Sequence, residues 1–214
     1  MNRTASEPGL RKGVGYQAML LGAFAALSAA LLILGNSSTH EAIAERQAED
    51  LLDSLSQVLP DAIHDNNLLN NAVLVEDASG NPLTIYRAMK DQRLTGFAYR
   101  VTGHGYAGEI ELIMGVNPLG ELIGVRVLAH SETPGLGDKI EIEKDNWITG
   151  FSGRSLKNTP ETAWRVKKDG GEIDQFSGAT ITPRAVTKAV HEGLVFFQEH
   201  RNELAVMTDS EDTR

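Results

Sequence analysis

The stretch from Val14 to Leu34 constrains this chain more than any other part of its sequence. It contains no charged residue and is dominated by Ala, Leu, Met, Phe and Ile. A helix of about 20 such residues matches the thickness of the hydrocarbon core of a bilayer. Arg3, Arg11 and Lys12 precede it, whereas the charged residues just after it are mostly acidic. Because cytoplasmic flanks are rich in Lys and Arg, this predicts a membrane anchor with a cytoplasmic N-terminus and the rest of the chain outside the cytoplasm.

A cleaved signal peptide is the alternative to a retained anchor. The apolar core of a signal peptide is shorter, about 7–15 residues, and a small-x-small cleavage site follows it. Here the apolar run ends in Leu31–Asn36, which is a poor cleavage sequence, so we expect an uncleaved span. Small residues recur four positions apart along it, at Ala18, Gly22, Ala26 and Ala30. Either this stripe receives another membrane helix, or it only reflects an Ala-rich span.

The composition argues against several classes of function. The chain has no cysteine, which excludes thiolate metal sites, iron–sulfur clusters held by this chain and Cys nucleophiles. Its net charge of −9 argues against a nucleic-acid partner, which would require a basic face. The six histidines show no metal-binding spacing, so we expect no metal site. Ser177 is not in a G-x-S-x-G elbow, and the sequence gives little support to a hydrolase.

After the membrane segment, the sequence predicts a second, amphipathic helix. Ser38 and Glu41 have the spacing of a capping box at its start. Apolar residues then recur with helical period until Pro60 closes the segment. The polar, Asn-rich stretch 65–71 predicts a loop.

Strand signals begin at residue 72. Short apolar or alternating segments predict strands at 72–75, 83–87, 96–102, 109–114, 123–127 and 164–166. Asn117–Gly120 has turn chemistry between two of them, which predicts a hairpin and a sheet that is at least partly antiparallel. In the strand after this turn, Ile123, Val125 and Val127 are expected to share one face.

The clearest helix of the globular part is expected near Thr182. Thr182 can cap its N-terminus, and Pro183 suits its first position. Its buried stripe is predicted to be Val186, Ala189, Val190, Gly193, Leu194 and Phe197. A shorter helix is expected to start within 138–147.

These elements predict an α+β fold: one N-terminal transmembrane helix followed by a partly antiparallel sheet packed with helices. The expected divisions are a cytoplasmic N-terminus at 1–13, the transmembrane helix at 14–35, an amphipathic helix and linker at 36–71, a globular domain at 72–200 and a polar tail at 201–214.

Two glycine-rich loops are candidate binding segments. Gly103–Gly108 fits the pattern G-x-G-x-x-G, but a dinucleotide site of this kind must open a helix, and the following residues alternate as a strand. We therefore interpret it as a connection between strands. Ser131–Asp138 follows a strand, and its glycines permit positive φ. It is either a plain turn or a loop whose backbone a flat ring can approach.

A third candidate is Asp174–Thr180, which immediately precedes the last helix. The N–H groups and the dipole at a helix N-terminus stabilise an anionic phosphate. Small residues and hydroxyls gather at this point, as a phosphate site requires. An ordinary helix cap would give the same pattern, so the residues alone leave both interpretations open.

Two of these segments together resemble a known family. Phe176–Thr182 resembles the Ser/Thr-Gly-Ala-Thr flavinylation sequence of covalent FMN-binding domains, and Glu132–Gly137 resembles the second signature of that family. With one N-terminal span and 214 residues, the chain is similar to the G subunits of Rnf (Rsx) ion-translocating electron transport complexes. The C subunit of the sodium-pumping NADH:quinone reductase, which is usually longer, is the second resemblance.

The resemblance implies that FMN joins Thr180 through a phosphoester bond, made by a separate flavin transferase. It makes the globular domain an FMN-binding domain, with no catalytic residue of its own. Around the cofactor it implies Asp174, Ser177, Gly178 and Ala179 from the segment before the last helix. From the other loop it implies Thr133, Gly135, Leu136 and Gly137 against the flavin, with Glu132 and Lys139 as further contacts.

The resemblance also implies a function. The chain would be an electron-carrying subunit in the bacterial inner membrane, with its main domain in the periplasm and other Rnf/Rsx subunits as partners. Those partners would connect NADH and ferredoxin to ion movement, and this chain by itself would not turn over a substrate. Two other functions stay open: a tethered assembly protein without a cofactor, and a free-standing extracytoplasmic flavin reductase.

Overall fold

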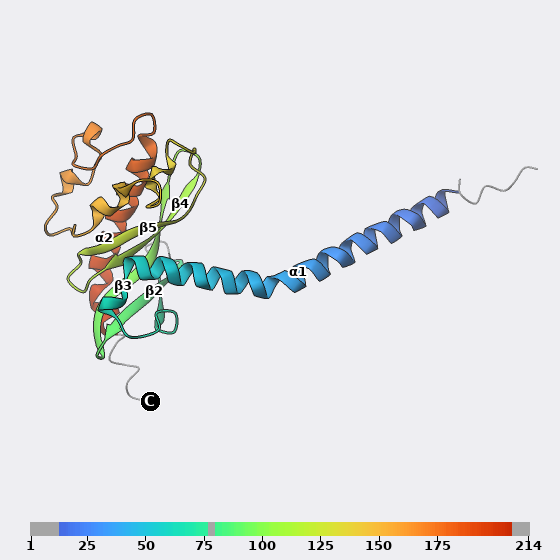
Figure 1. Cartoon of the computed structure of the whole chain (residues 1–214), viewed down its shortest axis with the longest axis horizontal. Helices are drawn as coiled ribbons and strands as arrows, with labels where there is room; N and C mark the ends of the chain where they lie inside the picture. Colours follow the sequence, from blue (N-terminus) through green and yellow to red (C-terminus); the bar gives the residue numbers. More distant parts are fainter. Residues whose placement is uncertain (1–12, 77–79, 207–214) are drawn as a thin grey trace, which may run out of the picture. The chain divides into compact units, whose positions relative to one another are not determined.

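The computed structural model describes residues 13–76 and 80–206, without the side chains of 34–42, 44, 45, 47, 205 and 206 (Figure 1). It contains two compact units, which divide between Asp50 and Leu51.

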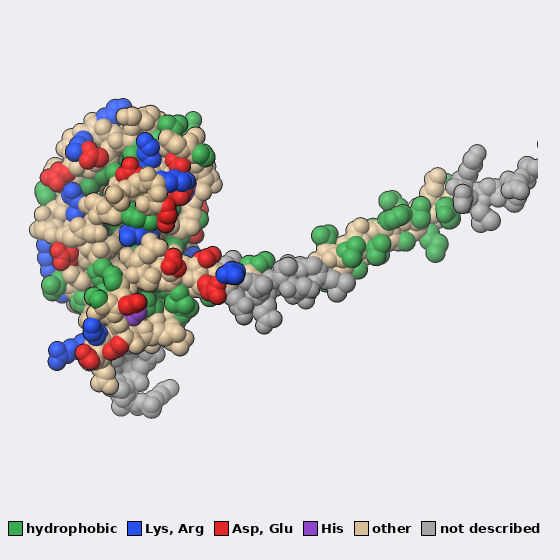
Figure 2. Space-filling view, viewed as in Figure 1, with side chains coloured by type: hydrophobic (Ala, Val, Ile, Leu, Met, Phe, Trp, Pro, Cys, Tyr) green, Lys and Arg blue, Asp and Glu red, His purple; other side chains and the backbone are tan. Residues whose placement is uncertain are grey.

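The first unit is helical and contains most of α1 (Val14–Val58). Its Val14–Ile33 segment is 20 residues long with a mean hydropathy of 1.8, which is long and apolar enough to cross a membrane. Figure 2 shows hydrophobic side chains along this segment, whereas Lys, Arg, Asp and Glu are spread over the visible face of the second unit. One apolar N-terminal helix is what a single-pass membrane protein requires.

The second helix expected to start at Ser38 does not start there, because α1 runs through this position without a break. No proline interrupts residues 14–58, and polar residues inside a helix each cost at most about 1 kcal/mol. The backbone hydrogen bonds of the helix therefore continue through a sequence that resembles an N-terminal cap. The side chains of Ser38 and Glu41 lie outside the described part.

The second unit contains a five-stranded antiparallel sheet in sequential order, β1 to β5. The strands are β1 (Ala72–Glu76), β2 (Pro82–Lys90), β3 (Arg93–His104), β4 (Glu109–Val116) and β5 (Leu122–His130). Each coincides with a strand predicted from the sequence. The sixth predicted strand, at 164–166, is wrong, because only Val166 makes an isolated bridge there, to Ile173.

The predicted faces of β5 are partly wrong. Val125 and Val127 contact the main core, as expected, but Ile123 packs on the opposite face. The pairing of β5 with β4 shifts between Gly115 and Val116, which makes Ile123 the extra residue of a β-bulge. One inserted residue reverses the alternation, and sequence periodicity does not reveal it.

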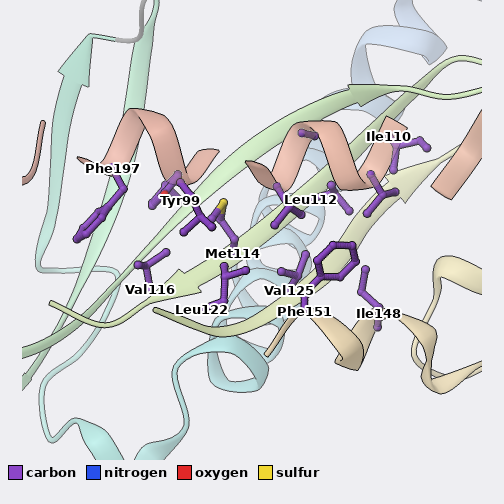
Figure 3. Close-up of a cluster of buried hydrophobic side chains, with 14 of the residues drawn as sticks. Tyr99, Ile110, Leu112, Met114, Val116, Leu122, Val125, Ile148, Phe151 and Phe197 are labelled. Atoms are coloured by element: carbon purple, nitrogen blue, oxygen red, sulfur yellow. The ribbon is translucent and has the colours of Figure 1, made fainter. Parts of the chain in front are cut away.

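The main core lies between the sheet and α2 (Ile181–Val206). Figure 3 shows some of its side chains, and the labelled ones come from β3, β4, β5, α2 and the short helix η4 (Asn146–Phe151). The predicted stripe of α2 faces this core, and Gly193 in that stripe allows a close approach to Met114. A second cluster covers the other face of the sheet, where Leu55, Val58 and Leu59 at the end of α1 meet Ile113.

Between β5 and α2 the chain forms short 3-10 helices, and two of them begin within 138–147, where a short helix was expected. They are η3 (Asp138–Ile140), η4, η5 (Glu161–Ala163) and η6 (Lys167–Asp169), and a further one, η2 (Asp61–Ile63), follows α1. The Asp145 side chain caps η4 by accepting from the Trp147 N–H at 2.9 Å. These turns pack Ile148 and Phe151 into the core and connect the loop after β5 with the segment that precedes α2.

Candidate functional site

A cavity of about 380 Å³ lies where the start of α2 meets two loops. Its lining comes from the β3–β4 hairpin, from the loop after β5 and from the turn that leads into α2. The lining residues are Tyr106, Glu132, Thr133, Leu136, Gly137, Gly178, Ala179, Thr180, Ile181 and Thr182. Two of the three candidate segments of the sequence therefore meet at one place, and Tyr106 of the third joins them.

A tight turn delivers Thr180 to this cavity. The Ala179 N–H donates to the Phe176 carbonyl at 3.2 Å, and Gly178 between them adopts a φ of +83°. Residues with a Cβ rarely adopt this conformation, so the turn needs glycine at that position. The buried Phe176 ring, with its centroid 5.1 Å from that of Trp147, anchors the turn.

Thr180 is the residue immediately before α2. Its carbonyl accepts the first hydrogen bond of the helix, from the Arg184 N–H at 3.4 Å, which places Thr180 at the N-cap. Its side chain is half-buried, and among the described residues the hydroxyl has no hydrogen-bond partner. The first N–H groups of a helix lack intrahelical partners and carry its positive dipole end. A phosphate esterified to this hydroxyl would lie next to them.

The prediction that Thr182 caps this helix is wrong. Thr182 lies in the first turn of α2, is 1% exposed, and donates its hydroxyl to Oε2 of Glu132. Glu132 comes from the loop after β5, so the partner of Thr182 is distant in sequence. A local pattern of Thr followed by Pro identifies the helix start to within two residues, but it cannot reveal this tertiary hydrogen bond.

The loop after β5 is a β-turn that presents Leu136 to the cavity. The N–H groups of Leu136 and Gly137 both donate to the Thr133 carbonyl at 3.1 Å. Pro134 and Gly135 occupy the middle of the turn, and Gly135 has a φ of +76°. This is the sequence preference of a type II turn, which has Pro at the second position and Gly at the third.

A charged cluster lies beside this loop, formed by His130 before it and by Asp138, Glu141 and Lys144 after it. Lys144 Nζ lies 2.9 Å from Oδ2 of Asp138 and 2.8 Å from Oε1 of Glu141. His130 Nδ1 accepts from the Glu132 N–H at 2.9 Å, so its proton lies on Nε2, 2.6 Å from Glu141. Lys144 first and His130 second lower the pKa of Glu141. The Gly135 N–H first and Lys144 second lower the pKa of Asp138.

Replacing Lys144 with methionine should flatten the acid dependence of stability. A carboxylate whose pKa is lowered on folding stabilises the fold above its unfolded pKa, about 4 for Asp and Glu, and loses this as the pH falls through its folded pKa. Without Lys144 this contribution shrinks at pH 7 but not in acid, where both carboxyl groups are protonated. Urea unfolding at several pH values would measure the difference. Lys157→Met is the control, because Lys157 is exposed and has no ion pair within the described ranges.

Four residues of the predicted cofactor site do not line the cavity. The Asp174 carboxylate pairs with Lys167 at 2.6 Å, and its carbonyl accepts from the Trp147 indole N–H at 2.7 Å. Ser177 is exposed, Gly135 lies within its turn, and Lys139 lies in η3. Conversely, Tyr106, Ile181 and Thr182 line the cavity and were not predicted for it.

Family comparisons agree with the place of this cavity. Residues 105–195 match the FMN-binding domain, and residues 11–58 match the RnfG N-terminal region. All the residues that line the cavity fall within the first match.

Individual relatives extend the similarity over most of the chain. The G subunit of the ion-translocating oxidoreductase complex of Cereibacter sphaeroides is 50% identical over 87% of this chain and 85% of its own length. The G subunit from Stutzerimonas stutzeri is 47% identical over 89% of this chain and 86% of its own. Among solved structures, the C subunit of the Na⁺-translocating NADH-quinone reductase of Parabacteroides distasonis has a TM-score of 0.52 at 21% identity, covering 73% of this chain and 94% of that one. This last similarity concerns the fold alone.

Proposed function

Because this chain belongs to the family of G subunits of ion-translocating oxidoreductase complexes, we propose that it relays electrons through FMN esterified to Thr180. Its FMN-binding domain supports the nature of the cofactor. The observation that carries the covalent site is the position of Thr180. Its hydroxyl stands at a helix N-cap, borders the cavity and has no hydrogen-bond partner within the described residues.

The residues around the cavity fit FMN. Its volume lies within the range of about 300–1,000 Å³ that is common for small-molecule sites. The N–H groups at the start of α2 suit a phosphate diester, which carries a single negative charge. Leu136 and Ile181 offer apolar surface at 43% and 46% exposure, as a flat ring system requires. A Cβ at Gly178 would make an ordinary van der Waals contact with Leu136 at 3.6 Å, so the positive φ of this residue, not a lack of space, calls for glycine.

FMN supplies the redox chemistry, and the protein supplies position and environment. Thr180 holds the cofactor by its phosphate, and the open cavity leaves a bound flavin accessible to an electron donor and an acceptor. Such a site makes few contacts that would retain the cofactor by themselves. A covalent bond removes the loss of FMN by dissociation, which suits a domain outside the cytoplasm.

The family also places this chain in a membrane complex, and we propose the following arrangement. The Val14–Ile33 helix spans the bacterial inner membrane, with the basic residues before it in the cytoplasm and the FMN-binding domain in the periplasm. The partners are the other subunits of the complex, and a flavin transferase acts during maturation. The identity of 50% to a G subunit favours this assembly over the sodium-pumping quinone reductase, to which only the fold is similar.

The mass of the intact protein tests this proposal directly. The full chain is expressed together with a flavin transferase, purified in detergent, and analysed by mass spectrometry and on a denaturing gel. We expect a mass increase of one FMN phosphoester, located on the peptide that contains Thr180, and a fluorescent band. An unmodified chain, in a culture where the transferase modifies a known substrate, would contradict the proposal and favour a tethered protein without a cofactor.

A further inference from the structure

Glu132 is a buried carboxylate that joins two elements of the cavity wall. Its side chain is 4% exposed, its Oε1 accepts from the Ala107 N–H at 2.9 Å, and its Oε2 accepts from the Thr182 hydroxyl. Ala107 belongs to the β3–β4 hairpin, and Thr182 belongs to the first turn of α2. Within the described ranges, no Lys, Arg or His side chain forms an ion pair with this carboxylate. A buried carboxylate is costly unless hydrogen bonds satisfy it, so its two hydrogen-bonded partners are held firmly.

The two glycine-rich loops are shaped around this carboxylate. A Cβ at Gly137 would lie 2.8 Å from Oε2 of Glu132, and a Cβ at Gly105 would overlap its Oε1. Neither glycine has a positive φ, so the backbone conformation would allow other residues there. Glycine is needed at both positions because a side chain would collide with the Glu132 carboxylate. Gly105 and Gly137 therefore leave room for Glu132.

The hairpin that Glu132 holds presents an exposed aromatic side chain to the cavity. Tyr106 lies between Gly105 and Ala107, lines the cavity, and is 73% exposed. The hairpin is closed by the Gly105 N–H, which donates to the Gly108 carbonyl at 2.8 Å. Leu136 also lines the cavity, from the loop after β5. Aromatic rings stack on flat conjugated systems, and a tyrosine on a held backbone loses little further entropy in doing so.

We propose that the β3–β4 hairpin is a flavin clamp, in which Tyr106 stacks on the isoalloxazine ring and Glu132 is the positioning residue that locks the hairpin to α2. The inference rests on the proposed function, because it requires FMN on Thr180. It gives the G-x-G-x-x-G segment a role that does not involve a dinucleotide. Gly105 makes room for the carboxylate, Ala107 offers the N–H that the carboxylate binds, and Tyr106 contacts the ring.

The fluorescence of the attached flavin tests the clamp. A phenol stacked on an excited flavin quenches its emission by electron transfer, so the FMN-loaded full chain should fluoresce weakly when folded. Tyr106→Leu should raise this emission several-fold, and Tyr106→Trp, which keeps a stacking electron donor, should restore the quenching. His104→Leu is the matched control in the same hairpin, because His104 does not line the cavity. Emission of Tyr106→Leu equal to that of wild type would overturn the stacking.

The role of Glu132 is tested by a double-mutant cycle. Glu132→Ala should raise the emission with Tyr106 still present and should accelerate hydrogen exchange of the Ala107 amide. Adding Tyr106→Leu should then give little further increase, because the two residues act as one unit. Glu132→Gln, which keeps one acceptor, should show a smaller effect and serves if the alanine variant does not fold. Unchanged emission and unchanged Ala107 exchange in both Glu132 variants would overturn the clamp.

The FMN content of each sample is also measured by intact mass spectrometry. Wild-type protein without FMN counts against the proposed function, whereas FMN-loaded variants with wild-type emission count against the clamp alone.

Discussion

Replacing Thr180 with alanine is expected to abolish covalent flavin attachment and to leave the fold intact. The substitution removes the hydroxyl to which FMN would be esterified. Within the part of the chain that the structure describes, this hydroxyl makes no hydrogen bond, so the fold loses none. The backbone bond from the Arg184 N–H to the residue 180 carbonyl does not depend on the side chain. The intact mass should equal that of the variant chain without FMN, and the fluorescent band should disappear. The thermal unfolding temperature should stay close to that of wild-type protein without FMN.

Two further substitutions supply the controls for this experiment. Ser152 is exposed, does not line the cavity and lies outside the segment 174–180, so Ser152→Ala should retain FMN. Thr180→Ser keeps a hydroxyl at the N-cap and is expected to accept FMN, although at a lower yield. Attachment that survives in Thr180→Ala would move the covalent site to another residue and would contradict its assignment to Thr180.

Replacing Gly115 with alanine is expected to give the largest loss of stability among single methyl additions in the sheet. A Cβ at Gly115 would overlap the backbone carbonyl oxygen of Val58, at the end of α1. This obstacle is main chain rather than a flexible side chain, so the last turn of α1 would have to move away from β4. Overpacking of this kind costs about 1–3 kcal/mol, and α1 carries Leu55 and Leu59 of the second core cluster with it.

Gly124 provides a matched control, because it pairs with Gly115 across β4 and β5. A Cβ at Gly124 would lie 3.4 Å from the Gln57 carbonyl oxygen, an ordinary van der Waals contact. Gly124→Ala should therefore change the free energy of unfolding much less than Gly115→Ala. Urea unfolding of the full chain in detergent, followed by the fluorescence of Trp147 and Trp164, would measure both. Equal effects of the two substitutions would show that α1 does not cross β4 so closely at Gly115.

Much of the candidate site follows from short segments of the sequence. The segment around Gly178 and Thr180 can be recognised because a helix N-terminus, a small residue and a hydroxyl must be adjacent in the chain to form such a site. The turn at Pro134 and Gly135 is equally local. The sequence of these segments does not reveal that Glu132 joins them. Glu132 accepts hydrogen bonds from Ala107 and Thr182 only once the sheet and α2 have packed together.

The sequence by itself determined the elements that depend on neighbouring residues. The apolar span, the five strands with an antiparallel hairpin among them and the stripe of α2 all follow from periodicity, turn residues and chain length. Only the tertiary structure decided that Ile123 faces away from the main core, that Thr182 binds a carboxylate instead of capping its helix, and that Tyr106 borders the cavity. The physical reason is that periodicity records which side of an element is apolar, whereas a β-bulge, a buried hydrogen bond and a cavity wall are set by residues far apart in the chain.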